Sequence, residues 1–127
     1  MLSSGSLTTI DGRTDMSTIK SPMELVRKFA PEFAQNQMDE KTLLFEHPKY
    51  QAVPGKYKAL MGIAVAAALG SEKCTEMWAR QAKEKGASNQ EITEAVMVAR
   101  FMKRATVNDT AAKMFSLLAE SEESSNA

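Results

Sequence analysis

The sequence is poor in the residues that build disulfides and metal sites. It has a single cysteine, Cys74, and a single histidine, His47. One cysteine excludes a disulfide within the chain and any Cys-only metal cluster within one chain. One histidine likewise excludes a two-histidine metal site there. We therefore expect neither a metal nor another cofactor.

Net charge and long apolar runs are lacking as well. Sixteen Lys and Arg residues balance sixteen Asp and Glu residues, so no overall field attracts nucleic acid or an anionic membrane. The longest apolar run, residues 60–70, is well short of the roughly 20 residues that span a bilayer. No basic stretch followed by an apolar core marks a secretory signal near the N-terminus. Together with the single thiol, these features favour a cytoplasmic protein without nucleic-acid or membrane partners.

What remains is the composition of one soluble globular domain. Of the 127 residues, 43% are hydrophobic and 25% are charged, which is ordinary for a folded protein. Residues 1–20 are rich in Ser, Thr, Gly and Asp and offer few large apolar groups, so we expect a flexible tail. Residues 121–127 are expected to form a frayed C-terminus. A single helical domain should therefore occupy residues 21–120.

Helix-start and helix-stop signals divide that domain into about six helices. Ser21 to Glu24 and Ser88 to Glu91 are capping boxes, and Gly70 and Gly86 are typical stops. No segment alternates between apolar and polar residues with hairpin turns at its ends, so the fold class is all-α, a compact helical bundle. The expected helices cover roughly residues 21–30, 33–45, 56–69 and 72–85, then one that opens at Ser88 and a last one capped by Asn108 or Asp109.

The expected helix 56–69 is apolar on nearly all sides. Such a helix is usually central and buried, and its many alanines allow neighbouring helices to approach closely. A chain of this size has a modest core, while its Ala- and Met-rich helices carry more apolar surface than water tolerates well. Self-association is the simplest way to cover that surface.

Cys74 is the conspicuous reactive group. If Ser71 caps the helix that follows Gly70, Cys74 is the third helical residue, where free N–H groups and the helix dipole stabilise a thiolate. The alternative is a small buried side chain at a helix start, because free cysteine is among the most buried residue types. Position and composition alone favour this alternative.

The other candidates are weaker. His47 lies beside Glu46 in an expected loop, where it would need partners from elsewhere to act as a ligand or base. Glu91 is explained by its capping box, whereas Glu94, one turn further in, is a candidate to point into a pocket. A basic cluster late in the same helix fits a solvated face near a helix C-terminus; it consists of Arg100, Lys103 and Arg104.

Residues 53–118 resemble the carboxymuconolactone decarboxylase and alkylhydroperoxidase D-like family. Three stretches carry the resemblance: GKYKALM at 55–61, IAVAAALG at 63–70, and GASNQEITEAV at 86–96, the last after a short link around Cys74. The third stretch is similar to the family's Gly-Ala-Thr-x-x-Glu-Ile-x-Glu-Ala-Leu. The resemblance implies an all-helical subunit that assembles into trimers or hexamers.

The resemblance also implies functional positions, and this chain departs from most of them. The family's peroxidase branch uses a glutamate, a Cys-x-x-Cys pair and a histidine four residues beyond the second cysteine. In this chain the glutamate position is Ala59, the first cysteine is Ser71, and the histidine is Trp78. Cys74 keeps the position of the attacking thiol. The chain thus lacks the resolving thiol, the acid and the base.

Three hypotheses follow for the function. The first is a peroxiredoxin-like oxidoreductase that uses Cys74 alone and an external thiol reductant. The second is a decarboxylase-like enzyme with a non-redox pocket, in which Cys74, Glu46 or His47 acts. The third is a non-catalytic oligomeric binding or scaffold protein. We expect a family member of peroxidase ancestry with absent or reduced redox activity, in which Trp78, one turn beyond Cys74, covers the sulfur.

The first testable prediction is that the protein is an obligate homo-oligomer, a hexamer or a trimer. The reason is the apolar helix surface that a chain of this length cannot bury by itself. Light scattering at micromolar concentration measures the mass directly. A stable, folded monomer would contradict the prediction.

Overall fold

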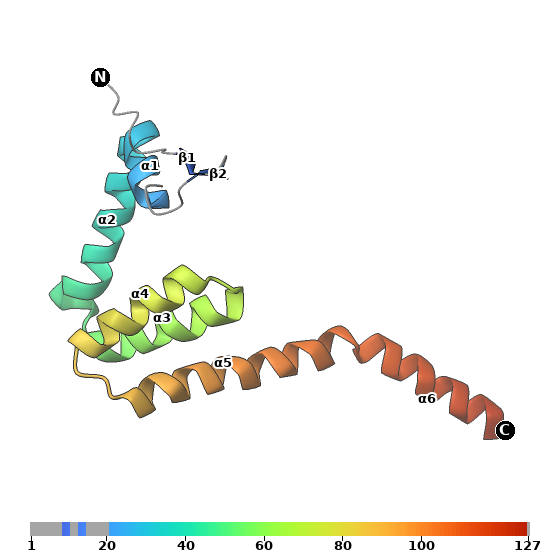
Figure 1. The fold of residues 1–127 in the computed structure, drawn as a ribbon. Coiled ribbons are helices and arrows are strands. Elements are labelled where there is room, and N and C mark those ends of the chain that lie inside the picture. The colour runs from blue at the N-terminus through green and yellow to red at the C-terminus, as the bar shows by residue number, and fades with distance from the viewer. Residues whose placement is uncertain (1–8, 11–12, 15–20, 127) are drawn as a thin grey trace. The chain divides into compact units, whose positions relative to one another are not determined.

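A computed structural model describes residues 9–10, 13–14 and 21–126 of the chain (Figure 1). The contacts divide the chain into two compact units, Met1–Tyr50 and Gln51–Ala127. Six α-helices account for nearly all of the described residues, so the predicted all-α class and number of helices are confirmed. The single helical domain expected over 21–120 stays a prediction, and most of the tail expected over 1–20 lies outside the described residues.

The first unit holds two helices and a short 3-10 turn. Helix α1 (Pro22–Phe29) begins where the Ser21 hydroxyl accepts a hydrogen bond from the Glu24 amide at 3.3 Å. Helix α2 (Pro31–Glu46) starts with a proline, which suits a first helical position because that position needs no amide donor. The turn η3 (Pro48–Tyr50) follows. Helix α1 packs on α2, and Ala34 is the buried α2 residue.

A very short strand pair was not expected from the sequence. Strand β1 (Thr9–Ile10) pairs antiparallel with β2 (Arg13–Thr14), with Thr9 opposite Thr14 and Ile10 opposite Arg13. Two residues per strand are too few to show the alternation from which strands are predicted.

The second unit is built around α3 (Gly55–Leu69). Helix α4 (Glu72–Glu84) turns back along α3 after Gly70, and α5 (Asn89–Thr110) packs on α3 as well (Figure 1). Gly70 makes the first reversal with a φ of 78°, in the left-handed region that glycine adopts without strain. The central position predicted for this helix is confirmed. Its burial is incomplete, because α4 and α5 leave one side open, where Met61, Val65 and Leu69 are exposed.

Small side chains make up the core of this unit. Ala59, Ile63, Ala82 and Ala87 form its buried centre, and Ile63 is the largest fully buried side chain among the described residues. The closest approach is at Gly62, where an added Cβ would come within 3.1 Å of the Trp78 ring atoms Cγ and Cδ2. Glycine at 62 therefore lets the indole of α4 lie directly on the backbone of α3.

A salt bridge between Glu91 and Lys56 connects the start of α5 to the start of α3. Ser88 Oγ accepts from the Glu91 amide at 3.0 Å, and Glu91 Oε1 accepts from the Ser88 amide at 2.9 Å, so the predicted capping box is confirmed. The second carboxylate oxygen of Glu91 lies 3.1 Å from Lys56 Nζ. These contacts lower the pKa of Glu91, first through the Ser88 backbone hydrogen bond and then through Lys56.

The C-terminal helices differ from the prediction at their boundary. Asn108 and Asp109, expected to cap the last helix, lie inside α5, which ends at Thr110, and α6 (Ala112–Asn126) begins after Ala111. The Thr106 and Thr110 hydroxyls donate to carbonyls one turn back, at 2.6 and 2.9 Å, so their polar groups are satisfied within the helix rather than by capping it. Helix α6 continues through residues expected to fray. Neither α5 nor any other helix of the described residues has the length and apolar character that crossing a bilayer requires.

The second prediction concerns Glu91. Because its pKa is lowered below the ordinary value of 4.5 in the fold, the ionised carboxylate stabilises the protein above that pH. The contribution is lost as the pH falls through the lowered pKa. Glu91→Gln should therefore unfold at lower urea concentration than wild type at pH 7, and the two midpoints should converge in acid. As a control, Glu94→Gln should show a smaller difference. Midpoints that stay apart down to pH 2 would contradict the prediction.

Candidate functional site

Cys74 lies in the first turn of α4, where the sequence places it. Ser71 is the N-cap, and its Oγ accepts from the Cys74 amide at 3.3 Å. The Thr75 hydroxyl donates to the Ser71 carbonyl oxygen at 2.6 Å and adds a second contact to the same turn. The predicted cap is confirmed. The cysteine itself is exposed, so burial as a small core side chain, the alternative that position and composition favour, is wrong for this chain.

Trp78 does not have the role expected from its spacing to Cys74. Its indole is half-buried, lies against the backbone at Gly62 and packs around the buried centre of the unit. The ring is thus directed to α3, and the sulfur-bearing residue one turn earlier stays exposed. The expectation that Trp78 covers the sulfur is therefore wrong. The physical reason is that the space above Gly62 accepts a flat aromatic ring, which gains more from burial there than over a solvated thiol.

Ala59 is built into the same packing layer. It is fully buried, in contact with the cluster that Ile63, Ala82 and Ala87 form. Both positions at which the resemblance implies an acid and a base, Ala59 and Trp78, are thus occupied by groups that pack α3 against its neighbours. Neither side chain transfers a proton to or from a bound substrate.

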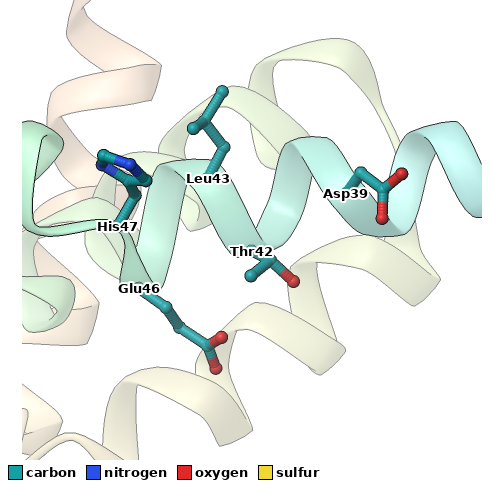
Figure 2. Close-up of a pocket in the computed structure, with 5 residues that line it drawn as sticks. All are labelled: Asp39, Thr42, Leu43, Glu46 and His47. Carbon is teal, nitrogen blue, oxygen red and sulfur yellow. The ribbon is translucent and has the colours of Figure 1, made fainter.

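A separate pocket lies at the C-terminal end of α2, in the first unit. It has a volume of 260 Å³ and is lined by Asp39, Thr42, Leu43, Glu46 and His47 (Figure 2). The first four follow the spacing i, i+3, i+4 and i+7 of one helix face. The sequence analysis did not identify Asp39, Thr42 and Leu43 as pocket residues, although this spacing places them on the same helix face as Glu46.

Glu46 and His47 share this pocket without forming a pair. Figure 2 shows the Glu46 carboxylate pointing away from the imidazole of His47. His47 Nδ1 accepts a hydrogen bond from the Lys49 amide at 3.1 Å, which assigns the imidazole proton of the neutral ring to Nε2. The ring also lies 5.7 Å from that of Tyr50, centroid to centroid. This network orients His47 within the turn that follows α2.

The remaining candidates are on the surface of the second unit. Glu94 is exposed and accepts from Gln90 Nε2 on its own helix at 2.9 Å, so it does not point inward as the sequence suggested. Ser71 lines a depression of 520 Å³ between the end of α3 and the start of α4; its other lining residues are Ala67, Gly70, Glu72, Thr75, Glu76 and Ala79. Across residues 9–10, 13–14 and 21–126, no three metal-ligating His, Cys, Asp or Glu side chains come together.

The basic cluster of α5 has two different roles. Lys103 Nζ donates to the Ala68 carbonyl oxygen at 2.9 Å, where a cation satisfies the carbonyl end of α3. Arg100 and Arg104 are exposed. The sequence placed the cluster near the C-terminus of its own helix, and this is wrong because α5 continues to Thr110.

The third prediction separates packing from shielding at Trp78. Trp78→Ala removes the ring that fills the space above Gly62 and should lower the free energy of unfolding by roughly 2–4 kcal/mol. Since Cys74 is already exposed, its rate of alkylation by iodoacetamide under native conditions should change less than about twofold. Gly62→Ala should also destabilise the protein, because its Cβ meets the same ring. If Cys74 is alkylated much faster in the folded Trp78→Ala variant than in wild type, the indole does shield the thiol and the prediction is wrong.

One known family matches the sequence. The family model described as the carboxymuconolactone decarboxylase family matches residues 31–115, which is more than half of the chain. No curated protein and no solved structure matches the chain. The matched residues include α2, the α3–α4 reversal that carries Cys74, and α5. The chain belongs to the carboxymuconolactone decarboxylase family.

Proposed function

We propose that this protein is a self-associating member of the family, of thiol-peroxidase ancestry, that no longer runs the two-cysteine redox cycle. The observation that carries the proposal is the packing of Ala59 and Trp78. The first is fully buried and the second lies on Gly62. The positions that the resemblance assigns to proton transfer are committed to holding α3 and α4 together. The one thiol of the chain, Cys74, is exposed on the first turn of α4.

The chemistry of the cycle explains why one thiol is insufficient. A thiolate attacks the terminal peroxide oxygen, the O–O bond breaks, and the products are a sulfenic acid and an alkoxide, which takes up a proton from an acid or from water to become the alcohol. A second thiol then condenses with the sulfenic acid, forming a disulfide and releasing water. Ser71 stands where the second thiol would be, and its hydroxyl does not form a disulfide. Any turnover at Cys74 therefore requires an external thiol reductant to supply both electrons.

A decarboxylase-like enzyme with a non-redox pocket is the second candidate. One observation favours it, namely that Glu46 and His47 line a common pocket with Asp39. General acid–base work requires both groups to reach one substrate, and the Glu46 carboxylate points away from His47 (Figure 2). We therefore rank this candidate below a non-catalytic binding or scaffold protein. A cytoplasmic location remains part of the proposal and is supported by the single thiol of the sequence.

The fourth prediction tests the redox part of the proposal. With an organic hydroperoxide and a dithiol-recycling partner, the wild-type protein should show no disulfide-linked turnover. Ser71→Cys restores the Cys-x-x-Cys spacing and is the matched variant. Since general acid–base catalysis contributes about 10²–10⁴-fold, this variant should form a disulfide with Cys74 on oxidation and still turn over at least about a hundredfold more slowly than an intact enzyme.

Two measurements decide the outcome. Mass spectrometry of Ser71→Cys reports whether the disulfide forms, and steady-state peroxide consumption reports turnover. Cys74→Ser in the wild-type background is the control for thiol-independent consumption. Robust wild-type turnover that Cys74→Ser abolishes would show that the proposed loss of redox activity is wrong.

A further inference from the structure

His47 makes three hydrogen bonds that end α2 and begin η3. Its backbone amide donates to the Thr42 carbonyl oxygen at 3.2 Å, and its carbonyl oxygen accepts from the Tyr50 amide at 3.0 Å. Its ring Nδ1 accepts from the Lys49 amide at 3.1 Å. Since Pro48 has no amide hydrogen, Lys49 carries the first amide after the histidine. The ring nitrogen therefore closes this turn as one of its hydrogen-bond acceptors.

The backbone at His47 explains how its ring reaches that amide. A residue that precedes proline is kept out of the helical region, and His47 has the extended angles φ −71° and ψ 127°. In turns of this kind an Asn or Asp side chain accepts from the amide two residues further on. Nδ1 is as many bonds from Cα as the Oδ1 atom of asparagine. His47 thus makes the contact that an asparagine makes in an Asx-turn, with an acceptor that titrates.

Only the neutral imidazole is able to make this contact. A neutral ring has one acceptor nitrogen, whereas the imidazolium ion carries an N–H group on both nitrogens. A proton bound at Nδ1 therefore replaces the acceptor by a donor that faces the Lys49 amide. Rotation of the ring does not restore the contact, because Nε2 is protonated as well. Histidine is the side chain that ordinarily changes its charge between about pH 5 and 8, and His47 is the single histidine of the chain.

The titratable and charged groups around His47 come from α2 and η3. Asp39 and Glu46 line the same pocket on α2, whereas Lys49 and Tyr50 belong to η3. The Glu46 carboxylate points away from the imidazole (Figure 2). The Lys49 ammonium lies 5.7 Å from the centre of the Tyr50 ring. The contact that a proton on Nδ1 breaks is thus the one with the Lys49 backbone amide.

We propose that His47 is a proton-operated latch on turn η3. The neutral ring holds the turn closed; uptake of one proton at Nδ1 breaks the hydrogen bond from the Lys49 amide and opens the turn at the end of α2. The proton comes from the solvent and returns to it as the pH rises. Mild acid therefore changes the turn and the pocket that His47 lines. The latch is independent of the proposed function, because it lies in the first unit and does not use Cys74.

The test follows the Lys49 amide of the ¹⁵N-labelled full chain by NMR between pH 8 and 5. Its exchange rate with water, divided by the rate of an unstructured peptide at the same pH, gives its protection. The net free energy of one hydrogen bond corresponds to about a two- to tenfold change in an equilibrium, so protection should fall by that factor. The fall should follow the protonation of Nδ1, which the ring ¹⁵N shifts report. The Glu24 amide, whose acceptor is the Ser21 hydroxyl, should keep its protection.

Two variants of His47 are matched controls. His47→Asn keeps an acceptor that does not titrate and should keep the Lys49 amide protected throughout this pH range. His47→Phe keeps a flat ring without an acceptor and should show the low protection at pH 8 as well. Circular dichroism confirms that both variants are folded.

Three results would overturn the latch. If wild-type Nδ1 is protonated while the Lys49 amide keeps its protection, the proton does not open the turn. If His47→Asn loses protection over the same pH range, a group other than His47 controls the turn. If His47→Phe is as protected as wild type at pH 8, Nδ1 is not the acceptor that holds the turn closed.

Discussion

The close approach of α3 and α4 is the interaction on which the second unit depends. Gly62 leaves the space in which the Trp78 indole lies, and a Cβ at that position would meet the ring at 3.1 Å. Ala59 and Ala82, on the two helices, are fully buried in the same contact. Because these side chains are so small, the backbones come close enough for a single large ring to fill the remaining volume. The core is therefore narrow and has Ile63 as its largest fully buried side chain.

This packing also explains the chemistry of the site. A carboxylic acid at position 59 or an imidazole at position 78 would have to be accommodated in the layer that holds the helices together. Burying an ionisable group there carries a desolvation cost unless partners satisfy it. Alanine and tryptophan avoid that cost and strengthen the contact. The thiol of Cys74 is exposed and lies outside this packed contact between α3 and α4.

A narrow core has a consequence for the outer helices. Helix α3 packs against both α4 and α5. Many apolar residues of α5 and α6 are not part of these contacts and are exposed. The second unit therefore buries little apolar surface for the number of helical residues that it contains. Stability in such a chain depends on what the outer helices pack against as much as on the core itself.

Local signals in the sequence determined the helices, their caps and the first turn of α4. Ser21, Ser71 and Ser88 all cap where they were expected to, because capping depends on residues three positions apart. The end of α5 was missed because Asn108 and Asp109 are cap formers only when the backbone leaves the helix, and here it continues. Only the tertiary structure decided that Trp78 lies on Gly62, that Cys74 is exposed and that Glu94 faces solvent. Each of these depends on the direction of a side chain relative to another helix, and sequence spacing within one helix does not contain that information.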